Sequence, residues 1–197
     1  KTFYYVSHMF AFKKKYFLII ENTKDINIKK IKKKNKFIII YRNQGIKENM
    51  SKMISFRKLC KLKLIKFYIA NDYHLALNLK SDGVYLSAKN LEYKALNFRR
   101  INFDIIGSAH NVKEINFKKK QGCKYILLSR LFKVSYKPKM NFMGINKFNN
   151  YAVRFFREIV PLGGINLSNL NKLKIIKAES LAIMSEVKKK PAIIDRL

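Results

Sequence analysis

The chain has 197 residues, of which 48% are apolar and 13% aromatic, and its 43 Lys and Arg against 12 Asp and Glu give a formal net charge of +31. The apolar content can fill the core of one domain and excludes intrinsic disorder, while 7 Gly and 3 Pro exclude a collagen-like chain. Two Cys cannot form a disulfide framework, and no apolar run reaches the about 20 residues of a bilayer span, so we expect a cytoplasmic protein that spans no membrane.

Short runs rich in β-branched and aromatic residues recur along the chain and predict eight strands. Each run has the length of a strand that is buried on both faces. In chain order the predicted strands are Tyr16–Ile20, Phe37–Arg42, Lys66–Ala70, Gly83–Leu86, Asp104–Ser108, Tyr125–Leu128, Ile159–Leu162 and Leu181–Met184.

Amphipathic, charged stretches between these runs predict helices. The apolar residues before and after Arg57 lie at helical spacing, although Arg57 itself interrupts their stripe. Asn111 is a candidate N-cap, with Glu114 at the third helical position as in a capping box. A last helix is predicted to begin at Asn166 or Ser168.

The alternation of strands and helical segments favours parallel pairing through right-handed crossovers. Eight such units predict an α/β fold of the (β/α)8 TIM-barrel type in a short version, because 197 residues is close to the lower limit for this fold. A doubly wound sheet is the alternative that the same pattern allows. We expect residues 1–15 to be an N-terminal extension of unknown role and residues 16–197 to form a single barrel domain.

Glycine is scarce, and a pair of adjacent glycines follows the seventh predicted strand. In barrels the loops after strands seven and eight often bind phosphate through exposed backbone N–H groups. Gly163 and Gly164 are therefore candidate phosphate-binding residues, with Ser185 after the eighth strand as their partner. A plain turn between a strand and a helix is the other interpretation of the pair.

The high positive charge raises the possibility of a nucleic-acid partner, but the composition argues against it. Lys supplies 35 of the 43 basic residues, and Ile and Asn are abundant as well, with 25 and 19 residues. All three have codons built from A and T, so a biased genome inflates them together, whereas selection for nucleic-acid binding does not inflate Ile. We therefore expect a solvated lysine-rich surface and no specific nucleic-acid partner. The sequence indicates no particular oligomeric state.

Several short motifs stand in one consistent order along the chain. They are residues 71–72, 81–86, 106–110, 122–126, 161–166 and 184–186. In this order and spacing they resemble the thiamine phosphate synthase family, which includes TenI-like thiazole tautomerases. The resemblance runs from about residue 16 to about residue 191 and implies a (β/α)8 barrel.

The resemblance also implies a reaction in thiamine biosynthesis. A hydroxymethylpyrimidine pyrophosphate loses pyrophosphate, and its methylene carbon is captured by the nitrogen of a thiazole phosphate. The partners implied are small phosphorylated substrates and the cofactor is Mg²⁺, because the leaving pyrophosphate needs cations to neutralise its charge.

Matching the family motifs residue by residue gives a candidate site. Pyrophosphate contacts are implied for Arg42, Asn71 and Ser108, and Lys137 aligns with a lysine in the loop after the sixth strand. A magnesium ligand is implied at Asp72, although a carboxylate at this position could also serve as an N-cap. The thiazole-phosphate site corresponds to the residues already singled out, namely Gly163, Gly164 and Ser185.

The chain departs from the family pattern at several of these positions. Asn90 stands where the family has its second magnesium-binding Asp, which removes one negative charge from the metal site. Ile40 replaces a pyrimidine-binding Gln, and Gln44 replaces a Lys. These changes weaken metal and pyrophosphate binding, whereas the phosphate end of the site keeps its residues.

Three alternatives to a synthase remain. His110, after the fifth strand, stands where TenI-like tautomerases place a catalytic histidine, and imidazole can move a proton near neutral pH. A non-catalytic relative that only binds a phosphorylated ligand is the second alternative. The third is a basic nucleic-acid-binding protein.

Overall fold

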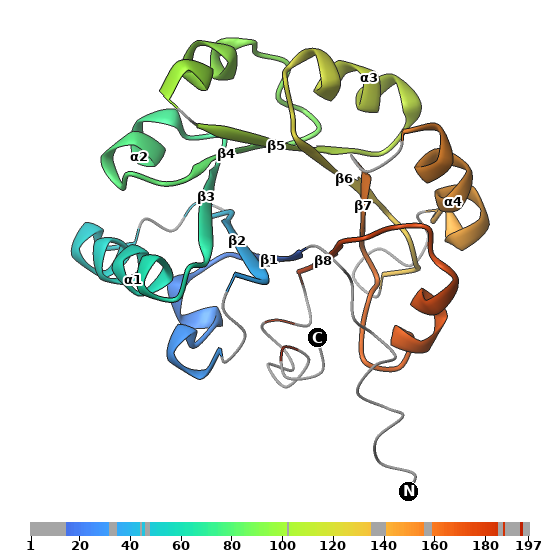
Figure 1. Ribbon diagram of the computed structural model, residues 1–197, viewed down its shortest axis with the longest axis horizontal. Coiled ribbons are helices and arrows are strands. Elements are labelled where there is room, and N and C mark those ends of the chain that lie inside the picture. The colour runs from blue at the N-terminus through green and yellow to red at the C-terminus, as the bar shows by residue number, and fades with distance from the viewer. Residues whose placement is uncertain are drawn as a thin grey trace, which may run out of the picture.

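The computed structural model describes residues 15–31, 35–43, 45, 48–101, 103–134, 141–155, 159–184, 187 and 194, with the backbone alone for 98–101. Eight parallel strands form a closed barrel, and the helices lie around its outside (Figure 1). The strands are β1 (Tyr16–Ile20), β2 (Phe37–Tyr41), β3 (Lys66–Ala70), β4 (Gly83–Leu86), β5 (Asp104–Ala109), β6 (Tyr125–Ser129), β7 (Ile159–Leu162) and β8 (Leu181–Ile183).

The strand pairing confirms the predicted (β/α)8 barrel and excludes the doubly wound sheet. Each strand pairs with its neighbour in sequence, and β1 closes the barrel by pairing with β8, where Tyr16 lies opposite Leu181. The predicted strands are all present, with ends that differ by at most one residue. The shortest strand is β8, and among the described residues it pairs with β7 only at Leu162 and Ala182.

The crossovers explain how so short a chain closes a barrel. Four of them carry α-helices: α1 (Met50–Leu62), α2 (Tyr73–Asn78), α3 (Val112–Lys120) and α4 (Gly144–Arg154). In the described parts of the crossovers after β1, β4 and β7, short 3-10 helices replace them: η1 (Thr23–Asp25), η2 (Ile28–Lys30), η3 (Lys94–Ile101) and η4 (Leu170–Ile175). No described helix has both the length and the apolar character needed to cross a bilayer.

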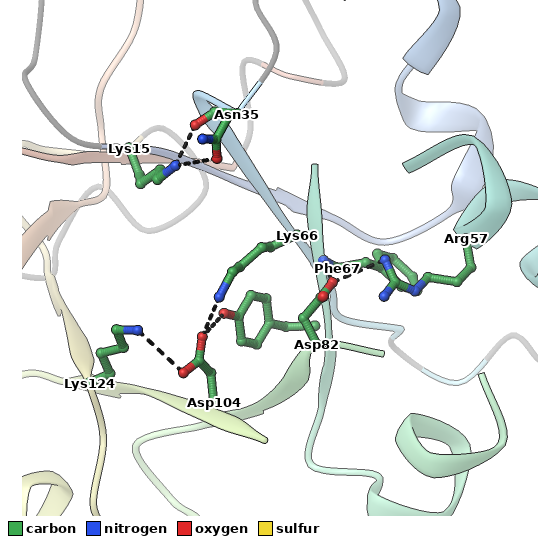
Figure 2. Close-up of polar contacts among 9 residues, drawn as sticks. Lys15, Asn35, Arg57, Lys66, Phe67, Asp82, Asp104 and Lys124 are labelled. Carbon is green, nitrogen blue, oxygen red and sulfur yellow. Dashed lines mark hydrogen bonds and ion pairs between the residues drawn. The ribbon is translucent and has the colours of Figure 1, made fainter. Parts of the chain in front are cut away.

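The predicted helices are found with local differences. Arg57 interrupts the apolar stripe of α1 because its guanidinium is buried in an ion pair with Asp82, at 3.0 Å between Nη1 and Oδ2 (Figure 2). Asn111 caps α3 as predicted, accepting the Glu114 N–H at 2.9 Å. The Glu114 carboxylate, however, accepts the N–H of His110 instead of that of the cap residue.

Two local expectations are corrected. The segment after β7 contains the 3-10 helix η4, and its N-cap is Asn169 instead of Asn166 or Ser168. Asn166 closes a preceding turn, because its Oδ1 accepts the N–H of Ser168 and of Asn169. The sequence argument also missed α4, although Phe148 and Ala152 are buried at the i, i+4 spacing of a helix face.

The strands are buried on both faces because side chains alternate between two cores. The outer core fills the space between strands and helices. The inner core fills the barrel with Phe17, Ile19, Ile38, Ile40, Tyr68, Tyr85, Ile106, Leu127, Val160, Leu162 and Ala182. The barrel strands run from residue 16 to residue 183, whereas residues 1–14 lie outside the described residues, so the division of the chain at residue 15 stays a prediction.

Candidate functional site

The predicted site residues come from strand ends, and parallel strands in a closed barrel bring those ends to one rim. We call this rim the carboxyl mouth. It receives Arg42 after β2, Asn71 and Asp72 after β3, Ser108 and His110 from the end of β5, and Gly163 and Gly164 after β7. Two further candidates, Lys137 and Ser185, lie outside the described residues.

The charge of Arg42 and the side chain of Ser108 both act on a buried tyrosine that the sequence argument did not single out. Tyr85 of β4 belongs to the inner core, and its phenol interacts with the Ser108 side chain. Burial raises the pKa of the Tyr85 phenol, while the Ser108 side chain and the positive charge of Arg42 act in the opposite direction. The two predicted pyrophosphate contacts therefore share one neighbour inside the carboxyl mouth.

Asn71 has an unusual backbone conformation that fixes its side chain. Its φ is +56°, in the left-handed region that Asn tolerates better than most residues. Its N–H donates to the Tyr85 carbonyl at 2.9 Å, and its Oδ1 accepts the Ser87 N–H at 3.0 Å. The side chain thereby anchors the loop after β4, and among the described residues its NH₂ group is the end left to donate to an anion.

Asp72 caps a helix and is also exposed where a cation could bind. Its Oδ1 accepts the Leu75 N–H at 2.9 Å and caps α2, so the N-cap interpretation is confirmed. The residue is nevertheless exposed at the carboxyl mouth. A carboxylate has several lone pairs, so Oδ2 can bind a cation while Oδ1 caps the helix.

Asn90 is tied to the outer layer of the barrel. Its Oδ1 accepts the Glu92 N–H at 3.0 Å, and its backbone carbonyl accepts from Lys118 Nζ at 2.7 Å and from Gln121 Nε2 at 3.2 Å. Both Lys118 and Gln121 are fully buried. These contacts fasten the loop after β4 to α3 and hold the Asn90 amide in that contact network.

The described carboxylates could hold a magnesium ion only together with phosphate oxygens of a substrate. The described residues contain no group of three or more His, Cys, Asp or Glu side chains that could enclose a metal ion. Mg²⁺ commonly keeps several waters and binds through one or two carboxylates together with substrate phosphates. One exposed carboxylate at Asp72 fits that mode of binding.

His110 is oriented by a carboxylate. Its ring Nδ1 lies 3.0 Å from Glu114 Oε2, and the same oxygen accepts the His110 backbone N–H at 2.8 Å. Partial burial acts to raise the pKa of Glu114, but the hydrogen bonds from His110 outweigh it and lower that pKa below its ordinary value. With the proton on Nδ1, the exposed ring presents Nε2 as an acceptor at the carboxyl mouth.

Glycine is required at 164 by the loop that precedes β7 in the chain. The φ values of Gly163 and Gly164 are +99° and +71°, in the left-handed region. A Cβ at 164 would lie 2.6 Å from the carbonyl oxygens of Phe132 and Lys133, so the loop after β6 packs directly against this backbone. The Phe132 N–H also donates to the Gly163 carbonyl at 3.0 Å. Packing against this loop is a structural reason for glycine at 164, and the packing partner was not visible in the sequence. Phosphate binding by the pair stays a prediction.

A comparison with protein families shows to which family the chain belongs. The family model described as thiamine monophosphate synthase matches residues 21–187, which covers most of the barrel. The chain belongs to the thiamine monophosphate synthase family.

Individual relatives carry the same name. The thiamine-phosphate synthase of Prochlorococcus marinus (strain MED4) is 31% identical over 140 residues, which is 71% of this chain and 40% of that protein. The thiamine-phosphate synthase of Pelagibacter ubique is 32% identical over 143 residues, covering 68% of this chain and 67% of that protein. The chain thus spans about two fifths of the length of the Prochlorococcus relative.

Among solved structures, thiamine phosphate pyrophosphorylase from Pyrococcus furiosus superposes with a TM-score of 0.68. The alignment covers 94% of this chain and 96% of that one, at 16% sequence identity, and shows the same fold. Against the pattern of this family, Ile40 is fully buried in the inner core, so it extends the apolar lining of the barrel where the resemblance implies a polar contact.

Proposed function

We propose that this member of the thiamine monophosphate synthase family joins hydroxymethylpyrimidine pyrophosphate to thiazole phosphate, releasing pyrophosphate. The observation that carries the proposal is the Asn71–Asp72 pair at the end of β3, on the same mouth as Arg42 and the glycine pair. The family match over residues 21–187 supports it. The substrates are small phosphorylated molecules.

In the proposed reaction the bond between the methylene carbon and the pyrophosphate oxygen breaks, and the thiazole nitrogen supplies the electron pair for the new C–N bond. Negative charge grows on the leaving oxygen. Arg42 offsets that charge, and the Asn71 NH₂ group and the Ser108 hydroxyl donate hydrogen bonds to the pyrophosphate. The apolar inner core below them lowers the local dielectric constant, which strengthens these interactions.

The metal and the second substrate use the remaining residues. Asp72 would hold Mg²⁺, which would supply positive charge against the leaving pyrophosphate. Gly163 and Gly164, together with Ser185, are proposed to bind the phosphate of the thiazole, and Lys137 is proposed to contact the pyrophosphate. We place the reaction in the cytoplasm, because Cys60 and Cys123 are buried free thiols, which suits a reducing compartment.

The test is an incubation of the full chain with both phosphorylated substrates and Mg²⁺, followed by measurement of thiamine phosphate. We expect product that requires both substrates and disappears when Mg²⁺ is chelated. Binding of thiazole phosphate without any thiamine phosphate formed would contradict the synthase proposal and leave a non-catalytic binding protein or a tautomerase.

A thiazole tautomerase is the second candidate, and the contact between His110 and Glu114 favours it. Under this alternative, the parent chain exchanges a proton on the thiazole but does not couple the two substrates. His110→Ala then abolishes the proton exchange. Under the synthase proposal, His110→Ala leaves most of the coupling activity. Measuring both reactions with the parent chain and with His110→Ala separates the candidates.

Asn90→Asp tests whether one carboxylate suffices for magnesium. The Gln121 amide lies 3.5 Å from Asn90 Oδ1 and the Lys118 ammonium donates to the Asn90 carbonyl, so we expect the new carboxylate to stay among these donors. The Mg²⁺ concentration for half-maximal activity should then change by less than about threefold, which is under 1 kcal/mol. A much lower Mg²⁺ requirement would instead show that position 90 reaches the metal.

A further inference from the structure

The rim opposite the carboxyl mouth carries a cluster of lysines around one carboxylate. We call this rim the amino mouth. Lys15 precedes β1, Lys66 begins β3, Asp104 begins β5 and Lys124 precedes β6, and Figure 2 shows Lys66 and Lys124 directed toward Asp104. Because all strands are parallel, this cluster lies a full strand length away from the proposed catalytic residues.

Asp104 is the carboxylate that the cluster shares. Its Oδ2 lies 2.6 Å from Lys66 Nζ and accepts the Tyr68 hydroxyl at 2.9 Å, and its Oδ1 lies 3.4 Å from Lys124 Nζ. Partial burial acts to raise the pKa of Asp104, but the contacts with Lys66, Tyr68 and Lys124 outweigh it and lower that pKa. The carboxylate is therefore ionised at neutral pH and offsets one positive charge of the two that contact it.

Positive charge remains in excess at this rim. The Lys15 ammonium donates to the side-chain and backbone oxygens of Asn35, which carry no charge, with 2.7 Å to Oδ1. Burial lowers the pKa of Lys15, and the nearby charges of Lys66 and Lys36 lower it further. Lysines here therefore repel one another, and an anion bound at the amino mouth would relieve that repulsion.

A cavity adjoins the cluster and gives such an anion space. It has a volume of about 360 Å³, within the range of small-molecule sites, and lies between the start of β5 and the end of α3. Asp104, Lys119 and Lys124 contribute its charged wall, and Gly122 and Cys123 contribute backbone. Lys119 and Lys124 give the wall two ammonium groups against the one carboxylate of Asp104, so the wall is positive overall, and the Lys119 ammonium also lies 5.7 Å from the centre of the Phe155 ring.

We propose that the amino mouth binds a small phosphate-bearing anion of the pyrophosphate class, held by Lys119 and Lys124 in the cavity and supported by the charge of Lys66. The site is separate from the proposed synthase site, and the inference does not depend on that function. Phosphate oxygens suit this position because each accepts hydrogen bonds from ammonium groups, and the multiple charges gain from several lysines at once.

Calorimetry of inorganic pyrophosphate binding tests the proposal. The titration contains a chelator, so that no Mg²⁺ is present, and the ionic strength is held constant. Arg42→Gln serves as the background to weaken binding at the carboxyl mouth. On that background, Lys124→Gln and Lys119→Gln should each weaken binding about tenfold, the effect of one charged hydrogen bond. Lys120→Gln is the matched control, because this exposed neighbour of Lys119 does not line the cavity, and it should leave the affinity unchanged. Equal losses in all three variants would overturn the proposal and indicate only the diffuse charge of the surface.

Asp104→Asn gives the opposite prediction. Removing the carboxylate leaves Lys66 and Lys124 without their shared partner, so pyrophosphate should bind at least about fivefold more tightly and should raise the melting temperature of this variant more than that of the parent chain. A cluster that serves only to stabilise the fold would lose stability in Asp104→Asn with no added response to pyrophosphate, and that result would overturn the proposal. If Asp104→Asn does not fold, the lysine variants and their control decide the question by themselves.

Discussion

Replacing Asp72 with asparagine is expected to lower thiamine phosphate formation by at least about 100-fold while leaving the fold intact. Asparagine caps helices as well as aspartate does, so the hydrogen bond to the Leu75 N–H survives and the stability should change by less than about 0.5 kcal/mol. The charge is lost, however, and Asp72 is the one carboxylate that the proposed metal site contains. Initial rates over a range of Mg²⁺ concentrations measure the effect.

A control for the loss of a carboxylate is Glu92→Gln, because the Glu92 residue is exposed and its carboxylate makes a long surface ion pair with Lys94, at 3.6 Å. Its activity should match that of the parent chain. Asp72→Ala should lose the activity as well, together with about 1 kcal/mol of stability from the missing cap. Full activity in Asp72→Asn would mean that Asp72 caps α2 and does no more.

Replacing Gly83 with alanine is expected to prevent the barrel from forming. Gly83 begins β4 between β3 and β5, and a Cβ at this position would lie 1.8 Å from the carbonyl oxygen of Asp104 and 2.9 Å from Cε1 of Tyr68. The oxygen belongs to the backbone of the neighbouring strand, so no side-chain rotation relieves the overlap. We expect a loss above about 4 kcal/mol or an insoluble product, measured by chemical denaturation and circular dichroism.

The comparison variant for this substitution is Gly45→Ala. Gly45 has a φ of +112°, yet among the described residues no atom outside the adjoining chain lies within 4 Å of the Cβ that alanine would add. Its cost is therefore limited to backbone strain, about 1–2 kcal/mol. Similar denaturation midpoints for the two variants would show that the strand spacing beside Gly83 adjusts more readily than the contact distances imply.

The strands were predictable because each is buried on both faces and so reads as an uninterrupted apolar run, such as residues 37–41. The helices were less predictable, since several crossovers are too short for an apolar stripe to show. In α1, which is long enough to show a stripe, Arg57 interrupts it. A buried guanidinium looks like an exposed position until its partner, Asp82, is known from the fold.

The candidate site shows the same division. Residues at strand ends, such as Asn71, Asp72 and the glycine pair, could be listed from the sequence, because parallel strands bring their ends together once the barrel is accepted. Contacts between segments that lie far apart in the chain could not be predicted from the sequence. Neither the interaction between Tyr85 and Ser108 nor the packing of Phe132 against Gly164 has a local signal in the sequence. The lysine cluster at the amino mouth was likewise hidden among the many lysines of the chain.

The brevity of β8 has a consequence for the order in which the barrel opens. This strand closes the ring, yet it has three residues and meets β7 at one paired position, so few hydrogen bonds resist separation of the two strands there. Local unfolding begins where the fewest contacts must break, so amide hydrogens of β8 should exchange with solvent sooner than those of β2 or β5. The proposed phosphate residues follow β7 and β8, so a ligand that joins these two strand ends would fasten the ring at its weakest point and slow that exchange.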